Sequence, residues 1–305
     1  MSFVGKLKEA YPVRWLYFAL KFKLPMQLMG ERKVEEKIFT QVLGYAPNLD
    51  NPQTLNEKMC WLKLHDHRDF CTMVADKYRV RSYIAEHFGE EHLVPLVRKL
   101  NSWQEVTKEA FPDYPTIIKC NSGAGTWKIV RDRNKVDYKR LRGRCHVWMT
   151  LNHYYETREW QYKNIQPCLL IEKLLMDSEG RVPADIKLHF FNGKCAFVYK
   201  VIDREGDNYR AFFTPDWKLL PFQFTSKAKY KKITKPIVEP RPQCLDEMLR
   251  IGTEIAKNFK YVRVDFYDMG KQFYFSEITL YHGAGYNQFY PAEYADEYAK
   301  LLEIG

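Results

Sequence analysis

Two short stretches near the C-terminal end decide the fold: YVRVDFY at residues 261–267 and FSEIT at residues 275–279. The first stretch alternates apolar with polar side chains, and in the second Glu277 and Thr279 share one face while Ile278 points away, which is typical of β-strands that bury one face. A Gly-containing segment separates them, so the sequence predicts a hairpin of two antiparallel strands, at 261–267 and 272–279.

Two carboxylates on this hairpin are candidates for a metal site. Strand alternation places Arg263 and Asp265 on one face. If the loop is 268–272, an odd count, Glu277 lies opposite Arg263 and diagonal to Asp265, with about 7–8 Å between backbones. Carboxylates that converge at this spacing can share a hard cation, whereas an even loop would place them on opposite faces. A charged, solvent-facing sheet surface is the alternative interpretation.

The rest of the chain contributes helices and further strands. Thr54 and Glu57 form a capping box that begins a helix, and a second helix is predicted at 72–87. The other predicted elements are strands at 116–119, 128–131 and 168–173, a hairpin of 186–191 and 194–202 that turns at Asn192 and Gly193, and a helix at about 244–258. Helices beside mainly antiparallel strands predict an α+β fold.

A short loop with Gly123 and Gly125 follows the strand at 116–119. It lies between two strands, so it is not a Walker-type P-loop, which leads into a helix N-terminus. A two-glycine hairpin can cover phosphates with its backbone N–H groups, and Lys119 at its base would supply a point charge. An ordinary turn is the alternative. The apolar strand at 168–173 is either a hinge that binds a planar ring or a core strand.

The composition is that of a folded, basic protein. The chain has 305 residues, with 48 Lys and Arg against 38 Asp and Glu, and its 7 Trp, 21 Tyr and 19 Phe exclude general disorder. A net charge of +10 favours an anionic partner: nucleic acid, phospholipid, nucleotide or acidic polysaccharide. Seven dispersed cysteines fit a reducing compartment, and no apolar run approaches the roughly 20 residues of a membrane span, so we expect a cytoplasmic protein.

Residues 3–33 interleave seven lysines and arginines with large apolar side chains. This pattern favours a basic helix packed on its own domain, and it is also found in helices that lie on an anionic membrane surface. The membrane interpretation would place the protein at the inner face of the membrane.

Eight short motifs, taken in chain order, resemble the TupA-like (teichuronopeptide biosynthesis) branch of the ATP-grasp superfamily. They are LNEKMCWLKL (55–64), ADKYRVRSYI (75–84), KCNSGAG (119–125), REWQYKNIQP (158–167), IEKLL (171–175), DIKLHFFNGK (185–194), RVDFY (263–267) and FSEITLY (275–281). The resemblance runs from about residue 38 to the C-terminus. It implies an ATP-grasp fold in which two α+β lobes hold the nucleotide, with a helical N-terminal extension.

The corresponding domain prediction has four regions. These are a basic helical extension (1–45), an N-terminal helical and α+β region (46–115), a lid and hinge subdomain (116–175), and a C-terminal subdomain with the Mg²⁺ and phosphate site (176–305).

The resemblance also implies roles for individual residues in binding ATP. A lysine would hold the α- and β-phosphates, the glycine loop would cover them, and the hinge would bind adenine through its backbone. The residues concerned are Lys119 for the phosphates, Ser122, Gly123 and Gly125 for the loop, and Lys173 and Leu175 for the hinge, with Glu172 beside the ring.

The catalytic roles implied by the resemblance fall on the C-terminal region. Asp265 and Glu277 would coordinate Mg²⁺, and Arg263 would neutralise charge on the phosphoryl group during transfer. Lys187 and Arg204 are further candidates for binding phosphate or a substrate carboxylate.

The chain also departs from the family pattern. Thr279 replaces the Asn that often serves as a third metal ligand, and Ser122 and Ala124 replace the His and Ser expected in the lid. His282 stands where Pro is usual; it is either a group that reaches the acceptor or a structural histidine.

The implied reaction is ATP-dependent ligation. A carboxylate receives the γ-phosphoryl group, and an amine then displaces phosphate from the acylphosphate to give an amide. In the TupA-like branch the acceptor would be a capsular or other cell-envelope polysaccharide with uronic acids, or its sugar-nucleotide precursor, and the amine an amino acid or peptide. Such an anionic glycan suits the positive net charge.

Three alternatives remain open at this point. The chain could be a glycosyltransferase-type enzyme of polysaccharide biosynthesis that consumes no ATP, although the D-x-D motif of many such enzymes is absent. It could be an ATP-grasp kinase that acts on a sugar hydroxyl, or a non-catalytic nucleotide- or nucleic-acid-binding protein. No RNP, OB or helix-turn-helix signature appears, so we expect no nucleic-acid partner.

Overall fold

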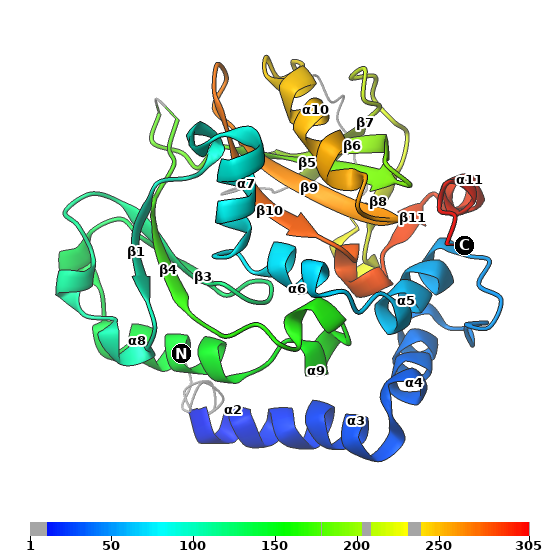
Figure 1. The fold of residues 1–305 in the computed structure, drawn as a ribbon, viewed down its shortest axis with the longest axis horizontal. Helices are drawn as coiled ribbons and strands as arrows, with labels where there is room; N and C mark the ends of the chain where they lie inside the picture. Colours follow the sequence, from blue (N-terminus) through cyan, green and yellow to red (C-terminus); the bar gives the residue numbers. More distant parts are fainter. Residues whose placement is uncertain (1–10, 178, 203–208, 231–238, 305) are drawn as a thin grey trace. The chain divides into compact units, whose positions relative to one another are not determined.

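The computed structural model describes residues 11–177, 179–202, 209–230 and 239–304, and the chain divides into two compact units (Figure 1). Unit 1 comprises Met1–Glu35, His67–Tyr83 and Val94–Leu174. Unit 2 comprises Glu36–Asp66, Ile84–Leu93 and Leu175–Gly305. Arg204, a predicted site residue, lies outside the described residues.

The described helices are α2 (Tyr11–Phe18), the π-helix η1 (Ala19–Lys23), α3 (Leu24–Met29), α4 (Glu31–Leu43), α5 (Leu55–His65), α6 (Asp69–Ala75), α7 (Val80–Phe88), α8 (Tyr138–Thr150), α9 (Tyr154–Thr157), α10 (Leu245–Ala256) and α11 (Ala295–Leu301). The strands are β1 (Leu96–Leu100), β2 (Thr116–Cys120), β3 (Trp127–Val130), β4 (Leu169–Lys173), β5 (Ala184–Phe191), β6 (Lys194–Ile202), β7 (Tyr209–Phe213), β8 (Gln223–Thr225), β9 (Tyr261–Asp268), β10 (Phe273–Thr279) and β11 (Gln288–Tyr290). Short 3₁₀ turns occur at η2 (Glu90–His92), η3 (Trp103–Glu105), η4 (Lys108–Ala110), η5 (Arg133–Lys135), η6 (Trp160–Tyr162), η7 (Lys227–Lys229), η8 (His282–Gly285) and η9 (Ala292–Tyr294). No helix among the described residues is both long enough and apolar enough to span a membrane.

Unit 1 is built on a four-stranded antiparallel sheet in the order β1-β4-β2-β3. Asp137 is the N-cap of helix α8, and its carboxylate accepts a hydrogen bond from the backbone N–H of Arg140 at 2.9 Å. Leu141 of α8 then packs with Ile118 and Ile171 of the sheet in one buried core. The apolar face of the strands therefore meets the helix, as the α+β prediction requires.

Unit 2 is built on a five-stranded antiparallel sheet in the order β10-β9-β5-β6-β7, and α10 packs against its central strands (Figure 1). Gly252 lies at the contact between α10 and β5. A Cβ atom added there would lie 2.6 Å from Cζ of Phe190, so only glycine allows this close approach. β8 and β11 form a separate two-stranded sheet.

Two local predictions are confirmed. Thr54 accepts a hydrogen bond from the N–H of Glu57 at 3.2 Å, and Glu57 accepts one from the N–H of Thr54 at 2.9 Å, which completes the capping box of α5. Asn192 and Gly193 have φ values of 45° and 81° and connect β5 to β6, as a two-residue hairpin turn requires.

The single helix predicted at 72–87 is wrong. The chain forms α6 and α7, which are separated by a turn at Asp76. The Asp76 carboxylate accepts hydrogen bonds from the backbone N–H groups of Tyr78 at 2.8 Å and Arg79 at 3.3 Å. A side chain that satisfies these N–H groups offers the backbone an alternative to the continuing helix.

The predicted register of the last hairpin is also wrong, although both carboxylates do lie on one face. Phe273 pairs with Asp268, which leaves an even loop at 269–272. A β-bulge between Phe275 and Glu277 then shifts the register by one residue. Glu277 therefore pairs directly with Asp265 rather than with Arg263.

Candidate active site

Two of the predicted catalytic residues, Lys187 and Arg263, meet the two predicted metal ligands on three neighbouring strands of unit 2, β5, β9 and β10. Arg263 donates from Nε and Nη2 to the two carboxylate oxygens of Asp265, each at 2.6 Å, and Nη2 also donates to Oε1 of Glu277 at 3.0 Å. Lys187 Nζ donates to Oδ2 of Asp265 from the adjacent strand. Asp265 is fully buried, whereas the Glu277 side chain is 31% exposed.

Ion pairs link the five charged side chains of this group, which we call the acidic cluster: Asp185, Lys187, Arg263, Asp265 and Glu277. Lys187 Nζ also lies 3.9 Å from Oδ1 of Asp185. Burial disfavours the charged form of Lys187, but the two aspartates outweigh burial and raise the pKa of Lys187. The pKa of Arg263 is likewise raised because Asp265 outweighs burial. Both bases therefore stay cationic, and three carboxylates face two cations.

The donor set of the acidic cluster fits Mg²⁺. Magnesium prefers oxygen ligands and is commonly held by one or two carboxylates, with substrate phosphates and water completing the shell. Asp265 and Glu277 are direct partners across β9 and β10, and the cluster has one carboxylate more than it has cations. Within the described ranges, no group of three or more His, Cys, Asp or Glu residues could hold a metal by itself.

His282 is a buried partner of Arg263. Its Nδ1 contacts Nη1 of Arg263, and a guanidinium can only donate, so Nδ1 accepts and the proton lies on Nε2. Burial, together with the Arg263 charge, holds the pKa of His282 well below its ordinary value, so the imidazole is neutral. Four N–H donors of Arg263 are thus engaged, which fixes the plane of its guanidinium.

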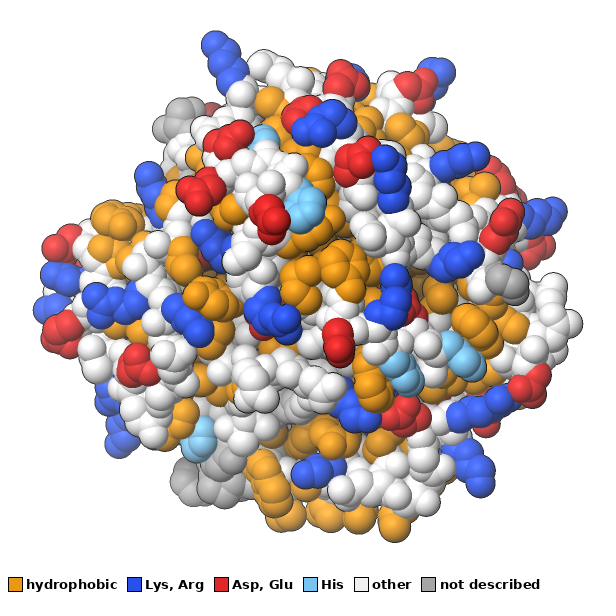
Figure 2. Space-filling view, in the orientation of Figure 1, with side chains coloured by type: hydrophobic (Ala, Val, Ile, Leu, Met, Phe, Trp, Pro, Cys, Tyr) orange, Lys and Arg blue, Asp and Glu red, His pale blue; other side chains and the backbone are white. Residues whose placement is uncertain are grey.

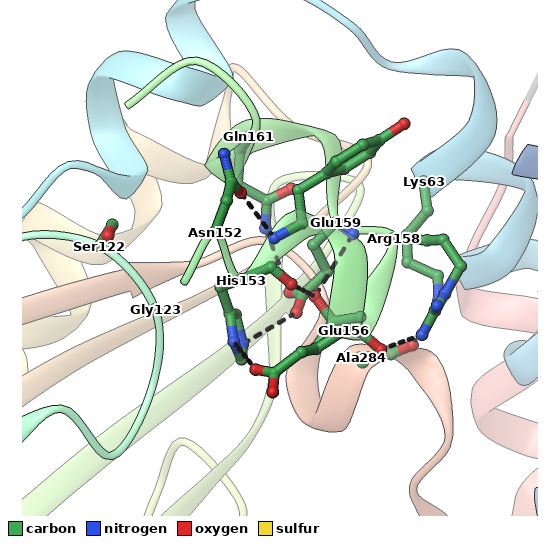
Figure 3. Close-up of polar contacts among 12 residues, drawn as sticks. Lys63, Ser122, Gly123, Asn152, His153, Glu156, Arg158, Glu159, Gln161 and Ala284 are labelled. Atoms are coloured by element: carbon green, nitrogen blue, oxygen red, sulfur yellow. Dashed lines mark hydrogen bonds and ion pairs between the residues drawn. The ribbon is translucent and has the colours of Figure 1, made fainter. Parts of the chain in front are cut away.

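The loop that carries His282 is held by the first family motif. Ala284 has φ 55°, a left-handed conformation that is costly for a residue with a Cβ atom. Lys63, buried in α5, donates to the carbonyl of Ala284 at 2.8 Å (Figure 3), and Asn56 donates to the carbonyl of Gly285 at 2.6 Å. The polar residues of the 55–64 motif therefore support the turn at His282.

A second group of charges lies in unit 1, and we call it the basic cluster: Arg81, Lys119 and Glu172. Lys119 Nζ lies 2.7 Å from Oε2 of Glu172, and Arg81 Nη1 lies 3.2 Å from Oε1. Glu172 is 3% exposed and is anchored between two cations. Here two cations face one carboxylate, so the balance is opposite to that of unit 2.

The glycine loop (residues 121–126) follows Lys119. Gly123 and Gly125 have φ values of 76° and 71°, which residues with a side chain rarely adopt. Lys77 Nζ donates to the carbonyl of Gly123 at 2.8 Å and so places another cation at the loop. Lys77 was not assigned a role from the sequence. It lies in the 75–84 motif, which is the only sequence signal that pointed to it.

A His–Glu group beside the glycine loop was also missed (Figure 3). A Cβ atom on Gly123 would lie 3.3 Å from Cγ of His153, so the imidazole packs against the loop. His153 Nδ1 lies 3.2 Å from Oε2 of Glu156, and its Nε2 lies 3.9 Å from Oε2 of Glu159. Gln161 donates to Glu159 at 3.1 Å. Glu159 and Gln161 belong to the 158–167 motif, for which the sequence predicts no individual roles.

Along the chain, the predicted adenine hinge includes residues assigned to each of the two units. Lys173 ends β4 in unit 1, and Leu175 is the first residue of the last segment of unit 2. The N–H of Lys173 already donates to the carbonyl of Pro95 at 3.0 Å. The ATP-binding roles stay predictions for all of these residues: Lys119, Ser122, Gly123, Gly125, Glu172, Lys173 and Leu175.

The solved structures that resemble this chain include two D-alanine–D-alanine ligases and the ATP-grasp ligase PsnB, all at low sequence identity. The D-alanine–D-alanine ligase from Bacillus anthracis in complex with ATP has 15% identity and a TM-score of 0.37, over 68% of this chain and 54% of that one. The ligase from Helicobacter pylori has 13% identity and a TM-score of 0.40, over 75% and 56%. The ATP-grasp ligase PsnB with a phosphomimetic variant of a minimal precursor, Mg and ADP has 10% identity and a TM-score of 0.39, over 81% and 64%.

The match therefore spans little more than half the length of these two D-alanine ligases. No curated protein matches it. The model of the family described as TupA-like ATPgrasp matches residues 57–302, which is most of the chain. The protein belongs to the TupA-like ATP-grasp family.

Proposed function

We propose that the protein is an ATP-dependent carboxylate–amine ligase that attaches an amino acid or peptide to a uronic-acid-containing surface polysaccharide or its precursor. One observation carries the proposal: Asp265 and Glu277 pair directly across two strands, with Lys187 and Arg263 bound to the same carboxylate. In a chain of this family, such a group supports phosphoryl transfer to a negatively charged acceptor.

The residues of unit 1 would bind the nucleotide phosphates. Two lysines lie at the glycine loop: Lys119 at its base, and Lys77, which donates to the carbonyl of Gly123. Because Glu172 compensates only part of the charge of Lys119 and Arg81, the basic cluster keeps an attraction for anions. The loop itself would cover the phosphates with backbone N–H groups.

The residues of unit 2 would favour the transfer step. A carboxylate oxygen of the acceptor attacks the γ-phosphorus while the bond to ADP breaks; the amine then forms a C–N bond as inorganic phosphate leaves. Arg263 and Lys187 would offset the repulsion between phosphoryl and carboxylate oxygens. Asp265 and Glu277 would hold Mg²⁺, which neutralises phosphate charge when it is bound.

A basic cavity in unit 1 supports an anionic acceptor. The cavity, of about 760 Å³, lies between β3 and the start of α8, and its cationic lining residues are Lys128, Arg131, Lys135, Arg140 and Arg144. Its two carboxylates are engaged locally: Asp132 accepts from the N–H of Asn134 at 2.8 Å, and Asp137 caps α8. A polymer of uronic acids would meet an excess of positive charge there.

The decisive experiment measures ADP release with Mg²⁺, uronic-acid glycans and a panel of amino acids, and identifies the product by mass spectrometry. We expect ADP release that depends on both the glycan and the amine, together with an amide product. ADP release with a phosphorylated hydroxyl and no amine requirement would indicate a kinase instead. UDP release from a sugar nucleotide without ATP would indicate a glycosyltransferase, and either result would overturn the ligase.

A further inference from the structure

The N-terminal helical segment exposes a row of leucines that no described part of the chain covers. Leu16, Leu20, Leu24 and Leu28 are 54%, 58%, 42% and 76% exposed. Residues four apart lie on the same face of a helix, so these side chains form a continuous row along α2, η1 and α3, which we call the leucine stripe. We propose that the leucine stripe docks on an anionic membrane surface.

The opposite face of the same helical segment packs against other parts of unit 1. Phe18 and Met26 are only 5% and 6% exposed, and the ring of Phe18 meets that of Tyr155 edge-on at 6.2 Å. Helix α2 contacts α8, and η1 contacts α9 (Figure 1). Figure 2 shows hydrophobic side chains gathered along the edge where α2 and α3 lie. The segment is therefore an anchored amphipathic helix whose exposed side is the apolar one.

Charge complementarity favours an anionic membrane over a second copy of the chain. From Tyr11 to Gly30 the sequence contains three basic residues and no Asp or Glu, and Lys6 and Lys8 precede this stretch. By helical spacing, Lys21 and Lys23 fall on either flank of the leucine stripe. Two such surfaces would repel each other, whereas anionic headgroups attract them.

Aromatic side chains at the edge of the stripe fit the same occupant. Trp15 and Tyr17 are 44% and 54% exposed, and the Nζ of Lys21 donates to the hydroxyl of Tyr17 at 2.6 Å. Indole and phenol rings prefer the headgroup level of a bilayer, where an apolar body and a polar tip are both satisfied. Leucines, flanking lysines and interfacial aromatics together are the composition of a helix that lies in the membrane interface.

The test is co-sedimentation of the full chain with vesicles of phosphatidylcholine alone or with about one-third phosphatidylglycerol. We expect binding to the anionic vesicles, much weaker binding to the neutral ones, and release at about 0.5 M salt, where surface charges are screened. Leu20→Glu with Leu24→Glu should lower the partition coefficient more than tenfold. Each of Lys21→Gln and Lys23→Gln should lower it about fivefold.

Leu219→Glu is the matched control, because Leu219 is 51% exposed and lies in unit 2. It should bind vesicles as the unchanged protein does, and all variants should keep the same circular dichroism spectrum. Absence of binding, or equal binding to both kinds of vesicle, would overturn the proposal. So would a dimer in sedimentation velocity that Leu20→Glu abolishes, because the stripe would then be an interface between two copies.

Discussion

The acidic cluster of unit 2 and the basic cluster of unit 1 use the same types of side chain with opposite balance. In the acidic cluster three carboxylates lie beside Lys187 and Arg263, whereas in the basic cluster one carboxylate, Glu172, pairs with both Lys119 and Arg81. Each cluster is tied together by ion pairs, so ion pairing by itself does not separate structural from functional charge. The two clusters differ in the sign of their surplus charge, which favours a cation at the acidic cluster and an anion at the basic cluster.

The largest effect should come from Asp265→Asn in the acidic cluster. Removing this charge leaves Arg263 and Lys187 without their shared partner, so we expect about 3 kcal/mol of destabilisation. ATP turnover should fall more than about 100-fold. Urea unfolding and ADP release measure the two effects, and Asp268→Asn at the end of the same strand is the control.

Glu277→Gln should separate the loss of turnover from the loss of stability, the two effects predicted for Asp265→Asn. Because the Glu277 side chain is 31% exposed, its loss should cost less than about 1 kcal/mol of stability while still abolishing most turnover. Near-normal turnover in both variants would contradict the proposed Mg²⁺ site.

Lys119→Met tests the basic cluster. Removing a charge-assisted contact to phosphate should raise the Kd for ATP about 10- to 100-fold, whereas stability should change little because Arg81 still pairs with Glu172. Titration calorimetry with a non-hydrolysable ATP analogue measures the affinity. Lys128→Met on the neighbouring strand should bind the analogue normally; an equal loss there would mean that affinity reflects net charge rather than this cluster.

Glu57 is a buried carboxylate held by backbone N–H groups rather than by cations. Its contribution to stability should therefore depend on pH, which tests a carboxylate outside both charged clusters. Burial raises its pKa, but hydrogen bonds from Asn48, Thr54 and Gln53 outweigh burial, so the pKa of Glu57 is lowered. When the pKa of a carboxyl group is lower in the folded state, the group stabilises the protein at pH values above its unfolded-state pKa. This stability is lost as the pH falls through the folded-state pKa.

Glu57→Gln should therefore cost about 1–2 kcal/mol at pH 7 and progressively less as the pH falls below about 4.5. Urea unfolding at several pH values measures the difference. The exposed Glu297→Gln in α11 should show little change at any pH, and a cost for Glu57→Gln that is independent of pH would refute the assignment.

The smallest predicted effect concerns the loop that carries His282. Ala284 has φ 55°, and glycine adopts this conformation without steric cost, so Ala284→Gly should stabilise the protein by about 0.5–1 kcal/mol. The shift in the urea midpoint measures it. Ala295→Gly at the start of α11 should instead be neutral or destabilising, because it removes a side chain from helical backbone. Destabilisation by Ala284→Gly would show that the contacts of the Ala284 methyl group contribute more to stability than the backbone strain costs.

Signals that act within a few residues were readable from the sequence. The capping box at Thr54, the turn at Asn192 and Gly193, and the alternation around Asp265 all depend on neighbours along the chain. The break at Asp76 was missed because its carboxylate, rather than a proline or glycine, competes with the helix. Such competition leaves little trace in the hydrophobic period.

By itself, therefore, the sequence determined the α+β class, the family, and the residue types of both charged clusters. Only the tertiary structure decided which of these residues meet. The bulge beside Glu277 sets the partner of Asp265, and Lys77 and His153 reach the glycine loop from segments distant in sequence. The physical reason is that turns, caps and alternation are local energies, whereas register and long-range contacts depend on the packing of whole sheets.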